Sequence, residues 1–259
     1  MLTVYPERAT GVSRRQEYKK MRRALFWTML PLMTPQALWV RKTAPRFSDA
    51  AGPAFGCTGE GKEKHLLAVG DSIIAGVGAP TLDDALVGQT ARALADGLSA
   101  ECHWQAFGWT GERSAGLVTN RLATLPEVDV DYVIVSMGVN DVTGLSTRSH
   151  FAQNMRRTLR GLRLRYPRAR IAVAGLPPLE LFPALPQPLR AFLGMRARML
   201  SKTLRNVVAG QPGAVFVPIA LDFSPDRFSG DGFHPSPLGY REFGEAMAQA
   251  LADTPAPAN

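Results

Sequence analysis

The chain alternates short apolar runs with longer stretches of helical spacing, and this alternation constrains its fold more than any other feature. Each apolar run spans four or five residues, a length typical of strands that are buried on both faces. Strands that alternate with helices predict a parallel sheet with helices on both sides. We therefore expect an α/β fold, a three-layer α/β/α sandwich around a five-stranded parallel sheet. The strands are expected at residues 66–69, 103–107, 132–136, 171–174 and 215–218.

The stretches between these strands have the spacing of amphipathic helices. The expected helices are residues 85–98, 151–166, 189–208 and 237–251. The segment Leu176–Pro188 is different, because its five prolines exclude a regular helix. We expect this apolar segment either to wall a substrate pocket or to serve as an ordinary connection packed on the core.

Positive charge is concentrated at the start of the chain. Residues 1–64 contain 12 Lys and Arg against 5 Asp and Glu, whereas residues 65–259 contain 18 against 17. A nucleic-acid-binding domain carries its basic excess on the folded body. The arginines between residues 156 and 170 are interpreted as a solvated helix face, so we expect no nucleic-acid partner.

The basic residues of this first region flank an apolar run, Ala24–Val40. Its 17 residues are fewer than the roughly 20 that a spanning helix needs, and they include Pro31 and Pro35. We interpret the run as a membrane anchor or an interfacial segment that contacts a membrane surface. A cleaved signal peptide and a helix packed on the domain are the alternatives. The interpretation favours a membrane-associated or exported protein, on the periplasmic side, over a purely cytoplasmic one.

These patterns divide the chain into four regions. Residues 1–46 form a basic and apolar extension, and residues 47–64 have the small, polar, Gly-rich composition of a linker. The folded domain is expected at residues 65–254, followed by a short tail at 255–259. The two cysteines, Cys57 and Cys102, cannot form a disulfide framework, although they could pair with each other.

Ser72 is the candidate nucleophile, because it lies in a Gly-Asp-Ser turn directly after the first expected strand. Ligands of open parallel sheets bind at the carboxyl ends of the strands. A serine hydroxyl also needs an adjacent base. His234 is the candidate base, since Asp231, three residues ahead in the same loop, can turn back and orient the ring. The remaining histidines are expected at strand beginnings or at a helix start: His65, His103 and His150.

Acyl transfer also requires hydrogen-bond donors aimed at the developing oxyanion. Asn140 follows the third expected strand and offers a side-chain amide, and the amide of Ser72 itself is a second donor. A glycine after the second expected strand is the third, with Gly108 and Gly111 as alternatives. Asp71 and Asp141, next to Ser72 and Asn140, are expected to brace turns.

Taken in order, the blocks at Ser72, Gly111, Asn140 and Asp231–His234 resemble those of the SGNH (GDSL-type) hydrolase family. The resemblance spans about residues 66–251. Phe107-Gly108 replaces an Asn-Ala-like pair that relatives often carry, and Glu112 stands where Asp is common, so the choice between Gly108 and Gly111 stays open.

The resemblance implies a flavodoxin-like sandwich and a serine carboxylic ester hydrolase, of esterase or lipase type, that acts through an acyl-enzyme. It implies Ser72, Asp231 and His234 as catalytic residues, and Ser72, Gly111 and Asn140 as the oxyanion hole. No cofactor and no metal is expected, and the expected partner is a small-molecule or lipid-like ester. The alternatives are an O-deacetylase of a cell-envelope polysaccharide, an acyl-thioesterase, and a non-catalytic membrane-associated scaffold.

Overall fold

A computed structural model describes residues 33–40, 42–43, 45, 47–219 and 222–257. The chain divides into two compact units, Met1–Ala44 and Pro45–Asn259. In the first unit the described residues, 33–40 and 42–43, are helical, and Thr43 Oγ1 donates a hydrogen bond to the carbonyl of Trp39 (2.8 Å). Most of the predicted anchor, Ala24–Val40, lies outside the described residues. Within them, no helix has the length and apolar character that crossing a bilayer requires.

The second unit contains a mixed sheet, which in the described part of the chain has six strands in the order β1-β3-β2-β4-β5-β6. The five strands from β3 to β6 in this order are parallel, and β1 pairs antiparallel with β3. Their bounds are β1 Phe55–Thr58, β2 Lys62–Gly70, β3 Ala100–Gly108, β4 Tyr132–Ser136, β5 Arg170–Ala174 and β6 Ala214–Val217. The five predicted strands are thus confirmed. The predicted number of strands is wrong, because the sheet has six strands in the described part of the chain and not five.

The additional strand, β1, lies in the segment where composition predicts a linker. Its four residues, Phe-Gly-Cys-Thr, are half-buried or exposed, because β1 is an edge strand with β3 on one side only. Strand β2 also begins at Lys62, before the predicted domain start. The linker prediction for residues 47–64 is therefore wrong for β1 and for the start of β2, and the compact unit begins at Pro45.

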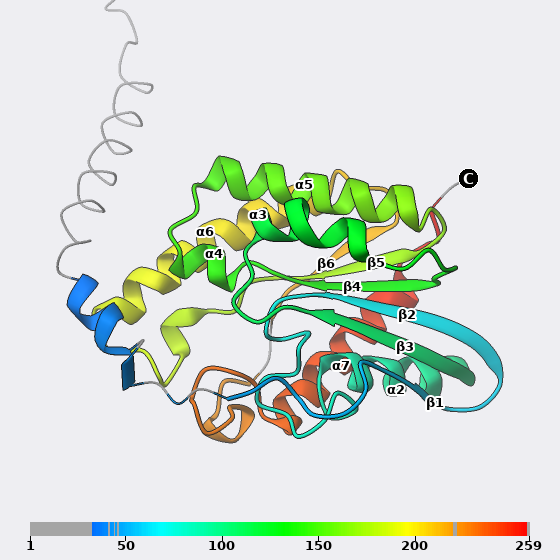
Figure 1. Ribbon diagram of the computed structural model, residues 1–259, viewed down its shortest axis with the longest axis horizontal. Helices are drawn as coiled ribbons and strands as arrows, with labels where there is room; N and C mark the ends of the chain where they lie inside the picture. Colours follow the sequence, from blue (N-terminus) through cyan, green and yellow to red (C-terminus); the bar gives the residue numbers. More distant parts are fainter. Residues whose placement is uncertain (1–32, 41, 44, 46, 220–221, 258–259) are drawn as a thin grey trace, which may run out of the picture. The chain divides into compact units, whose positions relative to one another are not determined.

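Helices cover both faces of the sheet, as the alternating pattern predicts (Figure 1). α2 and α7 pack together on one face, and α5 and α6 pack together on the other, with α3 and α4 beside them. The helices are α2 Leu86–Leu98, α3 Ser114–Gly116, α4 Val139–Thr143, α5 Arg148–Arg165, α6 Leu189–Val208 and α7 Pro237–Asp253. Short turns of other helix types are η1 Leu117–Arg121, η2 Leu122–Thr124, η3 Leu179–Leu181 and η4 Pro225–Arg227.

The core lies in two layers on either side of the sheet, because its central strands are buried on both faces. All five residues of β4 are buried. On the α2 and α7 side, Trp104 of β3 packs in one cluster with Leu86 and Phe243. On the other side, α5 buries Met155, Leu159 and Leu162. This enclosed sheet leaves the loops at the carboxyl ends of its strands to carry functional groups.

Candidate active site

Ser72 begins a compact turn at the carboxyl end of β2. Gly70 closes the strand where a side chain cannot fit, because a Cβ there would lie 2.0 Å from the carbonyl oxygen of Ser136 on β4. The next amide, that of Asp71, donates to the same oxygen (3.1 Å). The amides of Ile74 and Ala75 then turn back onto the carbonyl of Asp71. Main-chain contacts with β4 therefore fix the backbone position of the turn that carries Ser72.

His234 lies in a tight loop between η4 and α7. Phe228 and Pro235 form an antiparallel bridge at the base of this loop, and the amide of Ser229 donates to the carbonyl of His234 (2.8 Å). Inside the loop, Asp231 Oδ1 accepts hydrogen bonds from the backbone amides of Phe233 (2.8 Å) and His234 (2.9 Å). The loop amides thus hold the Asp231 carboxylate in place independently of its contact with the imidazole.

The structure brings Ser72, His234 and Asp231 into one hydrogen-bonded chain. His234 Nε2 lies 3.0 Å from Ser72 Oγ, and His234 Nδ1 lies 2.6 Å from Asp231 Oδ2. Burial raises the pKa of Asp231, but hydrogen bonds from the His234 side chain and the loop amides outweigh it and lower the pKa to about 2. A carboxylate that stays ionised can hold the imidazole with Nδ1 protonated and Nε2 free to accept the serine proton.

Asn140 and Gly111 lie in the same pocket as Ser72. Asn140 is in the first turn of α4, directly after β4, and its Nδ2 donates one hydrogen bond to the carbonyl of Glu112 (3.0 Å). The second hydrogen of that amide is left for another acceptor. Gly111 has a φ of +82°, a backbone conformation that favours glycine. Among the described residues, neither the Ser72 nor the Gly111 amide donates to another protein group.

Gly108, the alternative to Gly111, has a different environment. It is the last residue of β3, and a Cβ there would lie 2.2 Å from the amide nitrogen of Ala75. This glycine lets β3 approach the turn that carries Ser72. It is not among the residues that line the pocket, whereas Gly111 is.

The two aspartates expected to brace turns make such contacts. Asp141 accepts hydrogen bonds from the amide and the hydroxyl of Ser114 (2.9 and 2.8 Å), which join α4 to α3. Asp71 is buried and accepts from the amide of Ile73 (3.3 Å) and from that of Gly138. Burial raises the pKa of Asp71 to about 7, although these amides and His234 lower it in part.

An apolar cavity of about 230 Å³ adjoins the three-residue chain. The proline-rich segment Leu176–Pro188 contributes Leu176, Pro177 and Phe182 to its wall, so this segment does more than connect two elements. Phe182 packs edge-on against Phe228 and Phe233, with ring centroids 5.2 Å away in each pair. The cavity is thus lined mainly by hydrocarbon, with the hydroxyl of Ser72 at its polar end.

Sequence reasoning missed this aromatic wall. Phe223, Phe228 and Phe233 come from the loop after β6 and meet Phe182 from the loop after β5, so no local pattern reveals the cluster. The signal available in the sequence was the repeated phenylalanine around the Asp-x-x-His block. The other histidines lie elsewhere: His65 and His103 stack on each other on neighbouring strands, and His150 is exposed on α5.

The strand order and the groups gathered at the carboxyl ends of β2, β3 and β4 define a class, the serine-dependent ester hydrolases of SGNH type. Comparison with known sequences places the chain within that class. The sequence model of the GDSL-like lipase/acylhydrolase family matches residues 68–242, and the chain belongs to this family. The GDSL-like esterase Rv1075c of Mycobacterium tuberculosis is 28% identical over 244 residues, which cover 86% of this chain and 76% of that protein.

Solved structures share the fold. The structure of TesA superposes with a TM-score of 0.59 at 23% identity, covering 73% of this chain and 98% of that one. A family 3 carbohydrate esterase of Clostridium thermocellum gives a TM-score of 0.58 at 18% identity, covering 74% and 96%. The protein is therefore a GDSL-type serine ester hydrolase with the flavodoxin-like strand order of its class.

Proposed function

We propose that the protein hydrolyses carboxylic esters through an acyl-enzyme on Ser72. The observation that carries this proposal is the unbroken contact chain from Asp231 through His234 to Ser72, with its serine end open to the apolar cavity. His234 Nε2 takes the hydroxyl proton as Ser72 Oγ bonds to the carbonyl carbon. The same proton passes to the leaving alcohol as the ester C–O bond breaks. Water then gives a proton to His234 as its oxygen bonds to the acyl carbon. The bond between the acyl carbon and Ser72 Oγ breaks, the acid leaves, and the proton passes from His234 to Ser72 Oγ.

The oxyanion that forms in both steps needs donors that are already in place. We assign this role to the Ser72 amide, the Gly111 amide and Asn140 Nδ2. The free hydrogens of these groups and the position of Gly111 in the pocket wall support the assignment. Gly108 is better explained by its close approach to Ala75.

The cavity favours an acyl group of hydrocarbon character over a sugar. Its wall includes Leu176, Phe182 and Phe233, side chains that gain free energy when they bury methylene groups, at about 0.8 kcal/mol each. We therefore propose acyl esters of short to medium chain length as substrates. A deacetylase would instead prefer acetyl groups on a saccharide, and a thioesterase would prefer acyl thioesters of the same chain lengths.

The experiment replaces Ser72 with Ala and measures turnover of p-nitrophenyl esters from acetate to palmitate, acetylated sugars and acyl thioesters. We expect the variant to lose about 10³-fold or more in kcat and to escape labelling by a fluorophosphonate probe. The matched control is Ser136→Ala, which removes another serine of the same pocket and should keep its activity. Full activity of Ser72→Ala would exclude the proposed nucleophile. A rate that peaks at acetylated sugars would replace the acyl-ester substrate with a saccharide.

We further propose that the first 44 residues bring the enzyme to a membrane surface. The support is the apolar run Ala24–Val40 between basic clusters, a composition that favours anionic lipid interfaces. Such a location suits an enzyme whose cavity takes hydrocarbon, because lipid-like esters collect at the same interface.

A further inference from the structure

Three side chains of metal-binding type converge on the exposed end of the β1–β3 pair, outside the hydrolytic site. Cys57 on β1 is the register partner of His103 on β3, so the two side chains leave the sheet on the same face. Glu101 lies two residues before His103 on the same strand and therefore points to that face as well. Cys102, between them, is buried on the opposite face. Because side chains alternate between the two faces of a strand, one thiol, one imidazole and one carboxylate lie on the same face of the β1–β3 pair.

The spacing of their polar atoms is that of three corners of a zinc tetrahedron. Zn²⁺ binds thiolate sulfur at about 2.3 Å, imidazole nitrogen at about 2.05 Å and carboxylate oxygen at about 2.0 Å, so tetrahedral angles require S–N, S–O and N–O separations of about 3.6, 3.5 and 3.3 Å. The observed separations are 3.8 Å from Cys57 Sγ to His103 Nε2, 3.2 Å from Cys57 Sγ to Glu101 Oε1, and 3.3 Å from His103 Nε2 to Glu101 Oε1. A cation can enter with shifts of a few tenths of an ångström.

Without a metal the thiol of Cys57 donates a hydrogen bond to Glu101 (3.2 Å). A zinc ion replaces that proton, which leaves to solvent as the thiolate forms a bond to the metal.

We propose that Cys57, Glu101 and His103 bind one Zn²⁺ ion, with water in the fourth position, and that the ion fastens the edge strand β1 to β3. A thiolate, an imidazole and a carboxylate in tetrahedral arrangement favour zinc over Mg²⁺ or Ca²⁺, which take oxygen ligands. β1 has four residues and one neighbouring strand, so the ion adds an attachment to those of the backbone ladder. The ion takes no part in ester hydrolysis, since His103 lies five residues before the end of β3, about 16 Å along the strand from the edge that carries Ser72.

The experiment uses the full chain, without an added metal-binding tag, after removal of metals with a chelator. Calorimetric titration with ZnCl₂ should give one site per chain, and the melting temperature should rise with zinc concentration. Titration with Co²⁺ should produce a sulfur-to-cobalt charge-transfer band together with the intense d–d bands of tetrahedral cobalt. Hydrolysis of p-nitrophenyl butyrate should stay unchanged, because the ion is remote from Ser72.

Cys57→Ser and His103→Gln should each weaken zinc binding by about tenfold or more and should abolish the thiolate band or shift the d–d bands. The matched control is His65→Gln, because His65 stacks on His103 with ring centroids 5.5 Å apart but is outside the ligand set. The control should bind zinc like the parent chain. The proposal is overturned if binding is absent, if it is as tight in both ligand variants, or if cobalt shows no thiolate band.

Discussion

The side chain of Asp71 is buried directly beside Ser72, and burial disfavours the charged form of its carboxyl group. Its carboxyl accepts hydrogen bonds from the amides of Ile73 and Gly138, and these contacts tie the Ser72 turn to the start of α4. Burial nevertheless raises its pKa to about 7, so the folded protein holds a proton that the unfolded chain releases near pH 4. Asp71, which braces the Ser72 turn, thus makes the stability of the protein depend on pH.

Asp71→Asn should remove this dependence. With the folded pKa raised, the contribution of Asp71 is present below about pH 4 and is lost as the pH rises towards 7. Between about pH 5 and pH 8 the parent chain should lose about 2–3 kcal/mol of unfolding free energy relative to the variant. Urea unfolding across this range measures the difference. Asp96→Asn, at an exposed position of α2, is the control and should track the parent chain. Parallel curves for Asp71→Asn and its parent would contradict the raised pKa.

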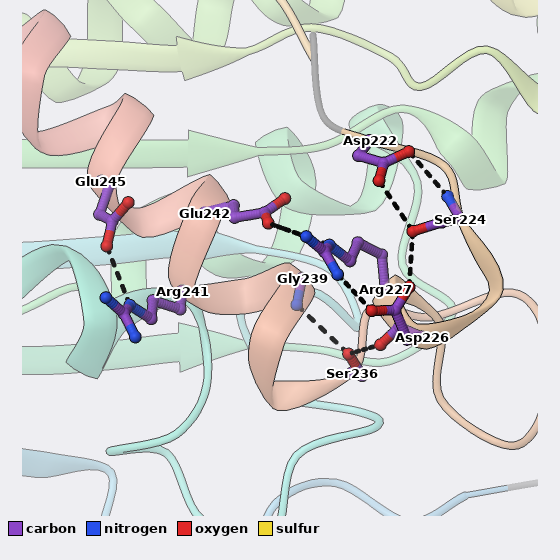
Figure 2. A network of polar contacts seen from close by, with 9 residues as sticks. All are labelled: Asp222, Ser224, Asp226, Arg227, Ser236, Gly239, Arg241, Glu242 and Glu245. Carbon is purple, nitrogen blue, oxygen red and sulfur yellow. Dashed lines mark hydrogen bonds and ion pairs between the residues drawn. The ribbon is translucent and has the colours of Figure 1, made fainter.

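The loop between β6 and α7 carries both Asp231 and His234, and an ion-pair network fastens it to α7 (Figure 2). Arg227 of this loop donates from Nε to Glu242 of α7 (2.9 Å), and its Nη2 lies 2.8 Å from the same oxygen. Asp226 pairs with the third nitrogen of Arg227, and the Asp226 carbonyl accepts the hydroxyl of Ser236, which caps α7. The helix therefore supports the loop at the point where the loop ends.

Glu242→Gln should loosen the loop while leaving the fold intact. We expect a small loss in unfolding free energy and a severalfold lower kcat, because the loop that carries His234 is held less firmly. Glu245→Gln is the matched control. It breaks the more exposed pair with Arg241 on the same helix, seen in Figure 2, and should change neither quantity. Equal kcat values for the two variants would show that the network does not position His234.

The sequence predicts the bounds of helices and strands better than the contacts between side chains of different loops. The predicted α6 agrees with the observed Leu189–Val208. The strands β2, β4 and β5 could be predicted because burial on both faces makes them continuously apolar. Strand β1 was missed because an edge strand with a small, polar sequence resembles a linker. The aromatic wall was missed because Phe182 and Phe233 meet only after two loops fold together. Ser72 and Asn140 could be predicted because each lies just after a strand, and Asp231 and His234 because they share a short Asp-x-x-His block.

Across the whole molecule, the hydrolase unit and the first 44 residues are separate compact units. The sheet, its helices and all the groups assigned to ester hydrolysis belong to the unit that begins at Pro45. The proposed ester hydrolysis thus belongs to the second unit, and the proposed membrane contact belongs to the first.

A chain that starts at Pro45 should keep kcat/KM for soluble p-nitrophenyl butyrate within about twofold of the full chain, because its catalytic groups are unchanged. It should stop sedimenting with vesicles that contain anionic lipid, whereas the full chain should sediment and should be released by salt. Sedimentation and turnover assays on the same preparations test the two expectations separately. Vesicle binding that persists in the shortened chain would assign membrane contact to the hydrolase unit instead.

The glycines at the ends of β2 and β3 divide the site into a rigid and an adaptable half. Gly70 abuts the carbonyl of Ser136 and Gly108 abuts the amide of Ala75, so neither position accepts even a methyl group without moving main chain. Phe182, Phe228 and Phe233 instead line the cavity and contact one another through their rings. Laboratory evolution towards new esters should accordingly accumulate changes at these phenylalanines and leave the strand ends, Asp231 and His234 untouched, so that substrate range can diversify around an unaltered Ser72 turn.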